Sequence, residues 1–171
     1  MSHSSKQAVF GIIFSEDKTK VLLIQRRDIP VWVLPGGGIE PGETKESAVV
    51  REMEEETGLT VSILRQTAEY SPVNGLTQTT HVFECKKEYG HEQKGSETRN
   101  IQFFNITELP KRMPPTFAYW ISDALRNEKS IIFRKIEGVS YFTIAKFLIL
   151  HPILCFRFLL TKIGIHINSK D

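Results

Sequence analysis

A run of acidic side chains at the end of one predicted helix constrains this chain more than any other feature of its sequence. The stretch REMEEETG carries Glu52, Glu54, Glu55 and Glu56 just before Gly58. Gly58 is a typical helix stop, because glycine adopts the left-handed conformation without a Cβ clash. Carboxylates near this end oppose the helix dipole, at about 0.3–1 kcal/mol, and repel one another by about 0.2–0.5 kcal/mol per pair. A solvated acidic surface would explain the crowding, unless the rest of the chain indicates a function for it.

Apolar runs rich in β-branched residues predict strands on both sides of this helix. Ala8–Phe14 and Lys20–Arg27 are expected to form a hairpin. The helix is expected from the N-cap Thr44 to about Thr57, with Ala48, Val49 and Met53 as its buried side. Residues 31–43 are expected to pass from a short strand into a glycine-rich loop, with later strands at 59–70, 76–88 and 101–106 and a closing helix at 114–129. Strands interrupted by one helix and followed by another predict an α/β sandwich with a mixed sheet.

Composition and charge limit the class of protein. The 171 residues suffice for one domain with a full core and an extension. The formal charge of +2 hides an asymmetry, since residues 131–171 hold six Lys or Arg against two acids and residues 1–130 are net acidic. An acidic body without a basic stripe makes sequence-specific nucleic-acid binding unexpected.

The cysteines and the N-terminal residues indicate the compartment. Cys85 and Cys155 match no metal-ligand spacing and imply no disulfide framework. The opening MSHSSKQ lacks the apolar core of a signal peptide. We therefore expect a cytoplasmic protein.

The acidic helix end belongs to a longer pattern of fixed spacing. Gly37 is followed after five residues by Glu43, and seven further residues lead to Arg51–Met53, Glu55–Glu56 and Gly58–Leu59. This pattern resembles the complete Nudix box, GX5EX7REUXEEXGU, in which U is a bulky apolar residue, and every fixed position is filled. With the flanking stretches LLIQRR, WVLPGG and FFNITELP, the resemblance covers about residues 7–128. It implies a Nudix-type α/β/α sandwich over residues 1–130 and a Mg²⁺-dependent pyrophosphohydrolase of nucleoside diphosphate derivatives.

The resemblance also assigns a role to the glutamates. At about 100° per residue, Glu52, Glu55 and Glu56 share one side of the helix and Glu54 points the other way. Carboxylate oxygens suit hard cations such as Mg²⁺ or Mn²⁺, whose charge would turn the mutual repulsion into attraction. Glu52, Glu55 and Glu56 are therefore the expected metal ligands, and Glu52 and Glu55 are also candidate catalytic bases.

The glycines and one arginine of the box complete the expected site. In this family a carbonyl of the glycine loop is a typical metal ligand, here Gly37, and Gly37 and Gly38 allow close approach of substrate to the backbone. Arg51 is expected to orient a glutamate through paired hydrogen bonds, with Glu43 as its partner.

Outside the box the expected site residues rest on fewer signals. Many family members use a further glutamate from a later loop, as base or metal ligand. The position of Glu97 in the sequence corresponds to that glutamate. Arg26 ends a strand and is a candidate for contact with phosphate or base, although a solvent-exposed arginine is the alternative. Trp32 and Tyr70 are expected to pack in the core rather than stack on a base.

The sequence thus predicts hydrolysis of a diphosphate linkage by a metal-activated water and leaves the substrate open. The alternatives are removal of pyrophosphate from RNA 5′ ends, which should favour a basic channel, and a Nudix module that binds nucleotides without catalysis, which should have a broken box.

The C-terminal residues 131–171 are expected to form an apolar, basic helical tail. Its longest stretch without Lys or Arg, Phe147–Phe156, is too short for the roughly 20 residues that span a membrane. A wide apolar face opposite Lys146 and Arg157 suits contact of residues 139–167 with the inner face of an anionic membrane. Packing on the domain itself or on a second copy of the chain is the alternative.

Overall fold

Two β-sheets and two helices account for most of the backbone that the structure describes. The computed structural model describes residues 6–75, 77–126, 129–140, 142 and 149. A five-stranded sheet has the order β4-β1-β6-β5-β8, and a three-stranded sheet has the order β3-β2-β7. The elements are β1 (Gln7–Ile12), β2 (Lys20–Arg26), β3 (Trp32–Val33), β4 (Gly36–Gly38), α1 (Lys45–Thr57), β5 (Leu59–Ser71), β6 (Thr79–Gly90), β7 (Thr98–Asn105), α2 (Pro115–Leu125) and β8 (Ile132–Lys135). The larger sheet is mixed, because β1–β6 and β5–β8 are parallel pairs whereas β1–β4 and β5–β6 are antiparallel.

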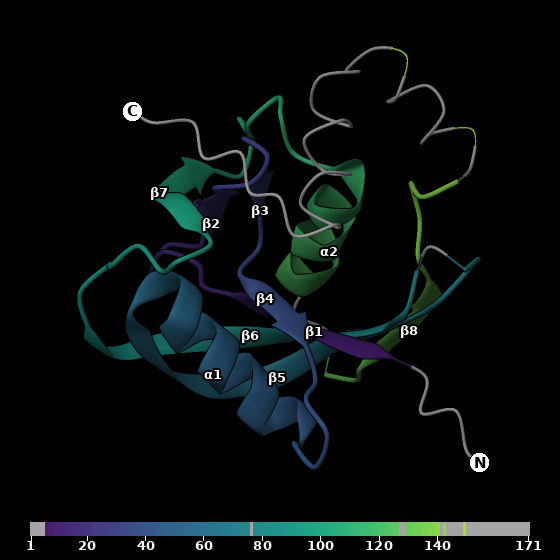
Figure 1. Ribbon diagram of the computed structural model, residues 1–171, viewed down its shortest axis with the longest axis horizontal. Coiled ribbons are helices and arrows are strands. Elements are labelled where there is room, and N and C mark those ends of the chain that lie inside the picture. Colours follow the sequence, from purple (N-terminus) through teal and green to yellow (C-terminus); the bar gives the residue numbers. More distant parts are fainter. Residues whose placement is uncertain (1–5, 76, 127–128, 141, 143–148, 150–171) are drawn as a thin grey trace.

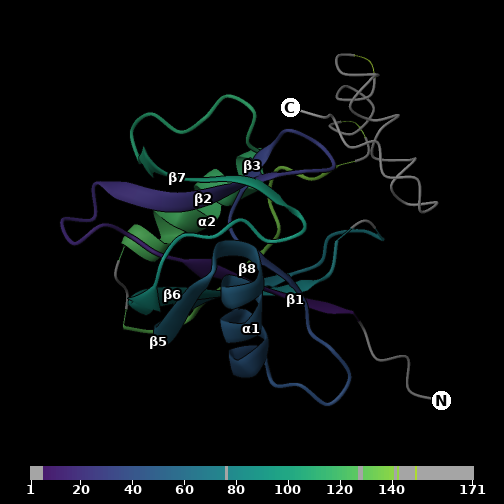
Figure 2. The same cartoon turned by 60° about the vertical axis from the view of Figure 1, so that its left-hand side comes forward.

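The two helices cover opposite faces of the five-stranded sheet (Figures 1 and 2). Alternation along β1 sends Val9 into a buried cluster with Val49 and Met53 of α1. Ile12, three residues further along and therefore on the other face, joins a second cluster with Trp120 of α2. This arrangement confirms the predicted α/β/α sandwich with a mixed sheet.

Helix α1 forms where the sequence predicts it, because both of its ends are capped. Thr44 and Ser47 form a capping box, in which each side chain accepts a hydrogen bond from the other residue's backbone N–H at 3.1 Å. At the other end Gly58 adopts φ 71° and its N–H donates to the Glu54 carbonyl at 2.8 Å. Ala48, Val49 and Met53 are fully buried, as expected.

The predicted hairpin of β1 and β2 is wrong over most of its length. The two strands pair only beside their connecting loop, where Leu22 N–H donates to the Ile13 carbonyl at 2.9 Å. Further along, β1 joins β4 and β6, while β2 joins β3 and β7 in the other sheet. Both strands are apolar on both faces, so their sequences do not specify their partners.

The glycine segment expected as a loop forms strand β4. Gly36–Gly38 pairs antiparallel with β1, and Gly36 stands opposite Phe10. An added Cβ at Gly36, where φ is +150°, would lie 2.2 Å from the Val9 carbonyl oxygen. Glycine is therefore required for this backbone to approach β1, and the approach fixes the position of the box next to the sheet.

Strand β8 lies in the segment that the sequence analysis assigned to the tail. Ile132 and Ile136 are buried in the cluster under α2, and Ile136 N–H donates to the Ser71 carbonyl at 3.0 Å. Thr116 of α2 donates through its hydroxyl to the Glu137 carbonyl at 3.0 Å. The folded domain therefore extends beyond residue 130. Most of the predicted helical segment 139–167 lies outside the described residues.

Within the described ranges, no helix is both long and apolar enough to cross a membrane.

A chain ending at Ser130 is expected to be much less stable than one ending at Ser140. The shorter chain loses two buried isoleucines, each worth about 1.5–3 kcal/mol, so its free energy of unfolding should fall by about 3–6 kcal/mol. Urea denaturation followed by circular dichroism of the two purified chains measures this difference. Coincident midpoints would show that β8 is dispensable.

Candidate active site

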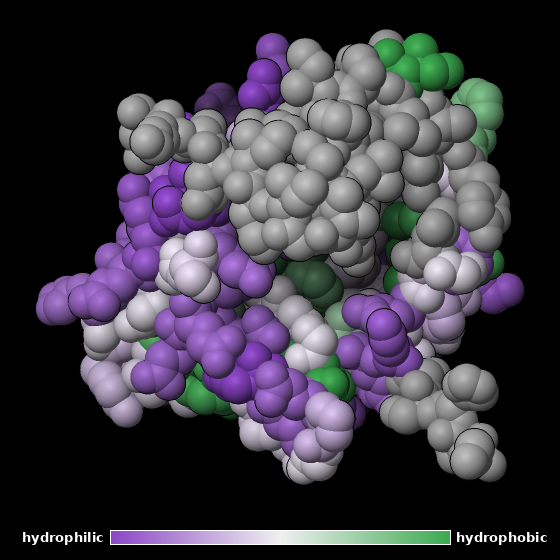
Figure 3. Space-filling view, in the orientation of Figure 1, coloured by the Kyte–Doolittle hydropathy of each residue, from purple (hydrophilic) through white to green (hydrophobic). Residues whose placement is uncertain are grey.

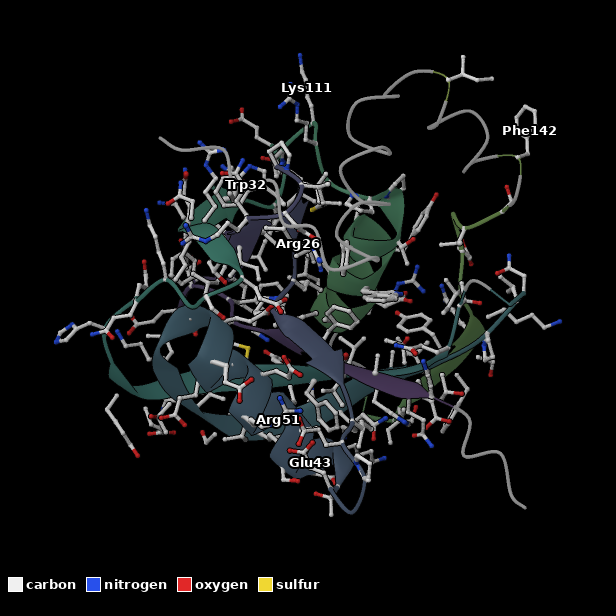
Figure 4. The ribbon with its side chains drawn as sticks, in the orientation of Figure 1. Arg26, Trp32, Glu43, Arg51, Lys111 and Phe142 are labelled. Carbon is white, nitrogen blue, oxygen red and sulfur yellow. The ribbon has the colours of Figure 1, made fainter. Side chains whose placement is uncertain are left out.

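One guanidinium holds the acidic residues of the box together. Arg51 donates from Nε and Nη2 to the two carboxylate oxygens of Glu43, at 3.0 and 3.1 Å. Its Nη1 donates to Glu52 at 2.9 Å and to Glu55 at 3.2 Å, and Nη2 also donates to the Gly38 carbonyl at 3.0 Å. Figure 4 shows Arg51 and Glu43 side by side at α1. The predicted pairing of Arg51 with Glu43 is confirmed, and that hydrogen bond is the main cause of the raised pKa of Arg51.

The carboxylate of Glu52 lies against the backbone of β4. A Cβ added at Gly37 would be 2.6 Å from Glu52 Oε1, so a larger residue there would displace the carboxylate. The Glu52 side chain is only 13% exposed, and burial raises its pKa despite the hydrogen bond from Arg51. Two of the predicted metal-binding residues, Gly37 and Glu52, are therefore adjacent.

Glu56 is the most deeply enclosed carboxylate of this group. Gly36 N–H donates to its Oε2 at 2.7 Å. Burial raises the pKa of Glu56 to about 7, and the charge of Glu52 adds to this rise, whereas the hydrogen bond from Gly36 and the charge of Arg26 oppose it. Glu56 therefore changes between its protonated and its charged form close to neutral pH.

The other two glutamates of the helix end face solvent. The Glu55 side chain is 59% exposed and contacts the protein through Arg51. Glu54 is exposed, and its side chain forms no ion pair or hydrogen bond with the described residues. Figure 3 shows hydrophilic side chains gathered over α1. Glu54 is thus a surface residue, as predicted.

Glu97 lies in the loop between β6 and β7 and is exposed. Burial is the main cause of the raised pKa of Glu52 and Glu56, and the charge of Glu97 adds to it. The Glu97 carbonyl accepts a hydrogen bond from Arg27 N–H at 2.8 Å. Of the two predicted residues outside the box, Glu97 thus acts electrostatically on Glu52 and Glu56, and Arg26 acts on Glu56.

The loop that carries Glu97 is packed against the C-terminal end of α1. Gln93 N–H donates to the Thr57 carbonyl at 2.8 Å. A Cβ on Gly95 would lie 2.1 Å from the Glu55 carbonyl oxygen, so this approach requires glycine. Sequence analysis missed Gly95, because a polar loop carries no pattern that indicates what it contacts.

Arg26 is held by an aspartate that the sequence did not single out. Its Nε and Nη2 donate to the two oxygens of Asp28, at 2.9 and 2.6 Å. In Figure 4 Arg26 and Arg51 stand on opposite sides of β4. The sequence places Asp28 two residues after Arg26 at a strand end. This spacing is too common to predict a contact between the two side chains.

The donor atoms fit a hard divalent cation. Among the side chains that the structure describes, no three His, Cys, Asp or Glu already surround one point. Glu52, Glu55 and Glu56 nevertheless share one side of α1 by their spacing, and the Gly37 backbone lies against Glu52. Oxygen donors of this kind suit Mg²⁺ or Mn²⁺. The pKa of Glu52 and Glu56 is raised mainly by burial and further by neighbouring carboxylates, and this repulsion favours added positive charge.

A cavity of about 580 Å³ opens on the face of the sheet opposite α1. It is lined by Ala8 and Phe10 of β1, Thr80 of β6, and Phe117 and Trp120 of α2, among others. Ala8 pairs with Gly38 and Phe10 with Gly36, so this cavity and the glutamates share the β1–β4 ladder. Its walls are mainly apolar and aromatic.

Two aromatic residues that could have been binding residues belong to the core. Tyr70 stacks on Trp120 with ring centroids 5.2 Å apart, and its hydroxyl donates to Asp123 at 2.9 Å. Trp32 packs edge-on against Phe104 at 4.6 Å. The predicted core role of Tyr70 is confirmed, and Trp32 is half-buried against the same cluster.

Comparison with known proteins agrees with this geometry. Residues 5–124 match the NUDIX domain family. A MutT-like protein of Streptomyces ambofaciens is 36% identical over 119 residues, which are 69% of this chain and 75% of the relative. A putative 8-oxo-dGTP diphosphatase of Bacillus subtilis is 33% identical over 118 residues, 68% of this chain and 78% of the relative.

A solved structure gives the same result. The crystal structure of an ADP-ribose pyrophosphatase from Streptococcus suis matches with a TM-score of 0.62 and 27% identity, and the match covers 77% of this chain and 99% of that one. The box, the sandwich fold and these matches agree, and the chain therefore belongs to the Nudix family, as a hydrolase that acts on phosphoric anhydrides.

Proposed function

We propose that this protein hydrolyses the diphosphate linkage of a nucleoside diphosphate derivative with the help of a divalent cation, Mg²⁺ or Mn²⁺. The observation that carries the proposal is the set of carboxylates braced by Arg51 beside the glycine strand β4. The names of the relatives point to different substrates, 8-oxo-dGTP for the Bacillus protein and ADP-ribose for the Streptococcus protein. What these two compounds share is a nucleoside attached to a diphosphate.

Each residue of the site has a distinct task in this proposal. Glu52, Glu55, Glu56 and the Gly37 carbonyl would hold the cation, with Glu97 as a further ligand or as the base. When bound, the cation offsets the negative oxygens of the anhydride and lowers the pKa of water. Arg51 keeps the carboxylates of Glu52 and Glu55 in place through its Nη1. Arg26, on the side of β4 opposite Arg51 in Figure 4, supplies a positive charge that would bind a phosphoryl group.

The apolar cavity suits the part of the substrate beyond the phosphates. Aromatic side chains such as Phe10, Phe117 and Trp120 offer surfaces on which a base packs. Because the cavity adjoins the other face of the β1–β4 ladder, a nucleoside there would direct its diphosphate toward the glutamates. The volume of about 580 Å³ lies in the range of small-molecule sites.

A substrate panel with the purified protein and Mg²⁺ tests the proposal. The panel contains 8-oxo-dGTP, ADP-ribose, other nucleoside diphosphate derivatives and 5′-triphosphorylated RNA. Release of a nucleoside monophosphate from a small substrate supports the proposal. Cleavage of the RNA alone would favour the 5′-end alternative, and binding without cleavage would favour the non-catalytic module.

Substitution Glu55→Gln is expected to lower kcat at least a hundredfold while the circular dichroism spectrum stays unchanged. An amide cannot supply the charge that binding of a divalent cation needs. The matched control is Glu54→Gln, one residue away and exposed, which should leave kcat unchanged. Turnover of Glu55→Gln within threefold of wild type at saturating Mg²⁺ would exclude Glu55 from the site.

Substitution Glu97→Gln separates two roles of that residue. If Glu97 is the base, kcat should fall over a broad pH range while the Mg²⁺ concentration for half-maximal activity stays the same. If it is a ligand, that concentration should rise. The control is Glu92→Gln, since Glu92 is an exposed residue of the same loop. If both variants behave identically, Glu97 has no catalytic or metal-binding role.

Bound Mg²⁺ should also stabilise the folded protein in the absence of substrate. A hundredfold excess over Kd adds about 2.7 kcal/mol, which corresponds to roughly 5–10 °C in Tm for a chain of this size. Differential scanning fluorimetry with Mg²⁺, and with EDTA as its control, measures the shift. Glu56→Gln should lose most of the shift, whereas an undiminished shift would place the cation elsewhere.

A further inference from the structure

The backbone of Arg26, at the end of β2, is held on both sides. On one side the register of β2 against β7 shifts between Gln25, which faces Asn100, and Arg26, which faces Thr98, so the extra residue lies in β7. On the other side Arg26 N–H donates to the Val31 carbonyl at 3.0 Å. These pairings fix the backbone position of Arg26.

The side chain of Arg26 is fixed as well, along one edge of its guanidinium. Nε and Nη2 bind both oxygens of Asp28, at 2.9 and 2.6 Å. Asp28 in turn accepts the Ile29 N–H at 2.8 Å through Oδ1, and its side chain is only 13% exposed. Although burial alone would raise it, the pKa of Asp28 is lowered by the hydrogen bonds from Arg26 and Ile29. Asp28 is therefore a charged and immobile partner.

The remaining edge of the Arg26 guanidinium is not bound by the protein. Nη1 makes no hydrogen bond within the described part of the chain, and the side chain is 37% exposed. The pKa of Arg26 is raised, first by the hydrogen bond to Asp28 and then, against burial, by the charges of Asp28, Glu97 and Glu56. One guanidinium edge is thus bound by Asp28, and the other is available to a ligand.

We propose that Asp28 is a positioning residue, which clamps the Nε–Nη2 edge of Arg26 so that Nη1 meets a phosphoryl oxygen of the bound diphosphate. This inference rests on the proposed function, since it assumes that a diphosphate lies beside α1. An arginine on a flexible side chain loses rotamer freedom when it binds a ligand, and a preformed bidentate pair removes most of that loss beforehand.

Asp28 could affect diphosphate binding through its charge alone or by positioning Arg26. The two explanations predict opposite changes in Kd when Asp28 is substituted. Asp28 places a negative charge next to the phosphate site, so its neutralisation should tighten diphosphate binding if charge alone matters. If Asp28 positions Arg26, the same change should weaken binding. The sign of the effect therefore separates the two explanations.

The experiment measures the Kd of methylenediphosphonate, a diphosphate whose bridge cannot be hydrolysed, by isothermal titration calorimetry with Mg²⁺. Asp28→Asn and Asp28→Ala should each weaken binding, by about three- to tenfold for the alanine variant. In an Arg26→Ala background the same changes should alter Kd less than twofold, because no side chain remains to be positioned. Two variants are used, so that a folding defect in the alanine variant leaves the isosteric asparagine variant informative.

The control is Asp17→Asn, which also neutralises an aspartate in a side-chain hydrogen-bond network. Asp17 precedes the other end of β2, about 20 Å from Arg26 along the strand. Its Kd for methylenediphosphonate should equal that of wild type.

Three results would overturn the inference: tighter or unchanged binding by both Asp28 variants, an equal loss with and without Arg26, or no binding by the wild-type protein. Failure of the proposed function looks different. A wild type that cleaves no anhydride but binds methylenediphosphonate with the expected coupling would refute hydrolysis and keep the role of Asp28. A wild type that cleaves the anhydride, but in which the Asp28 changes act independently of Arg26, would keep hydrolysis and refute the role of Asp28.

Discussion

Arg51 and the four groups that accept its hydrogen bonds determine the geometry of the whole site. Glu43 comes from the loop, Glu52 and Glu55 from the helix, and the Gly38 carbonyl from the strand. A planar guanidinium with a rigid set of donors is the group that can join three such elements at fixed angles. Without these hydrogen bonds, the position of β4 relative to α1 would no longer be fixed.

The glycines of the box matter for a complementary reason, which is the distance between backbone and carboxylate. At Gly36 the strand approaches β1, and at Gly37 it leaves room for the Glu52 carboxylate. The acids can then lie at the C-terminal half of a helix without a basic residue in its last turn, because Arg51 and the Gly36 N–H neutralise part of their charge. Burial, and after it the charge of neighbouring carboxylates, raises the pKa of Glu52 and Glu56. A stable fold would not need this arrangement, whereas a cation site does.

Sequence alone predicted the parts that depend on neighbours along the chain. Helix α1, its caps at Thr44 and Gly58, its buried side and the pairing of Arg51 with Glu43 all follow from local spacing. Sheet membership did not follow, because β1 and β2 are apolar on both faces and their partners are distant in sequence. The strand nature of β4 was missed since glycine has no strand propensity, and β8 was missed since an apolar segment also suits a helix. Asp28 and Gly95 act through contacts that no sequence period reveals.

The two arginines of the site are not equivalent. In Arg51 each of Nε, Nη1 and Nη2 already has a protein acceptor, so a substrate phosphate would have to displace a carboxylate to reach it. Arg26 has protein acceptors on one edge only, and the charges of Glu97 and Glu56 act on it without a hydrogen bond. Among these two, Arg26 is therefore the cation available to an incoming anion, and Arg51 is a structural one. The division follows from the number of carboxylates that contact each arginine directly. Three surround Arg51, whereas Asp28 binds Arg26 directly and the two glutamates act on it only through their charge.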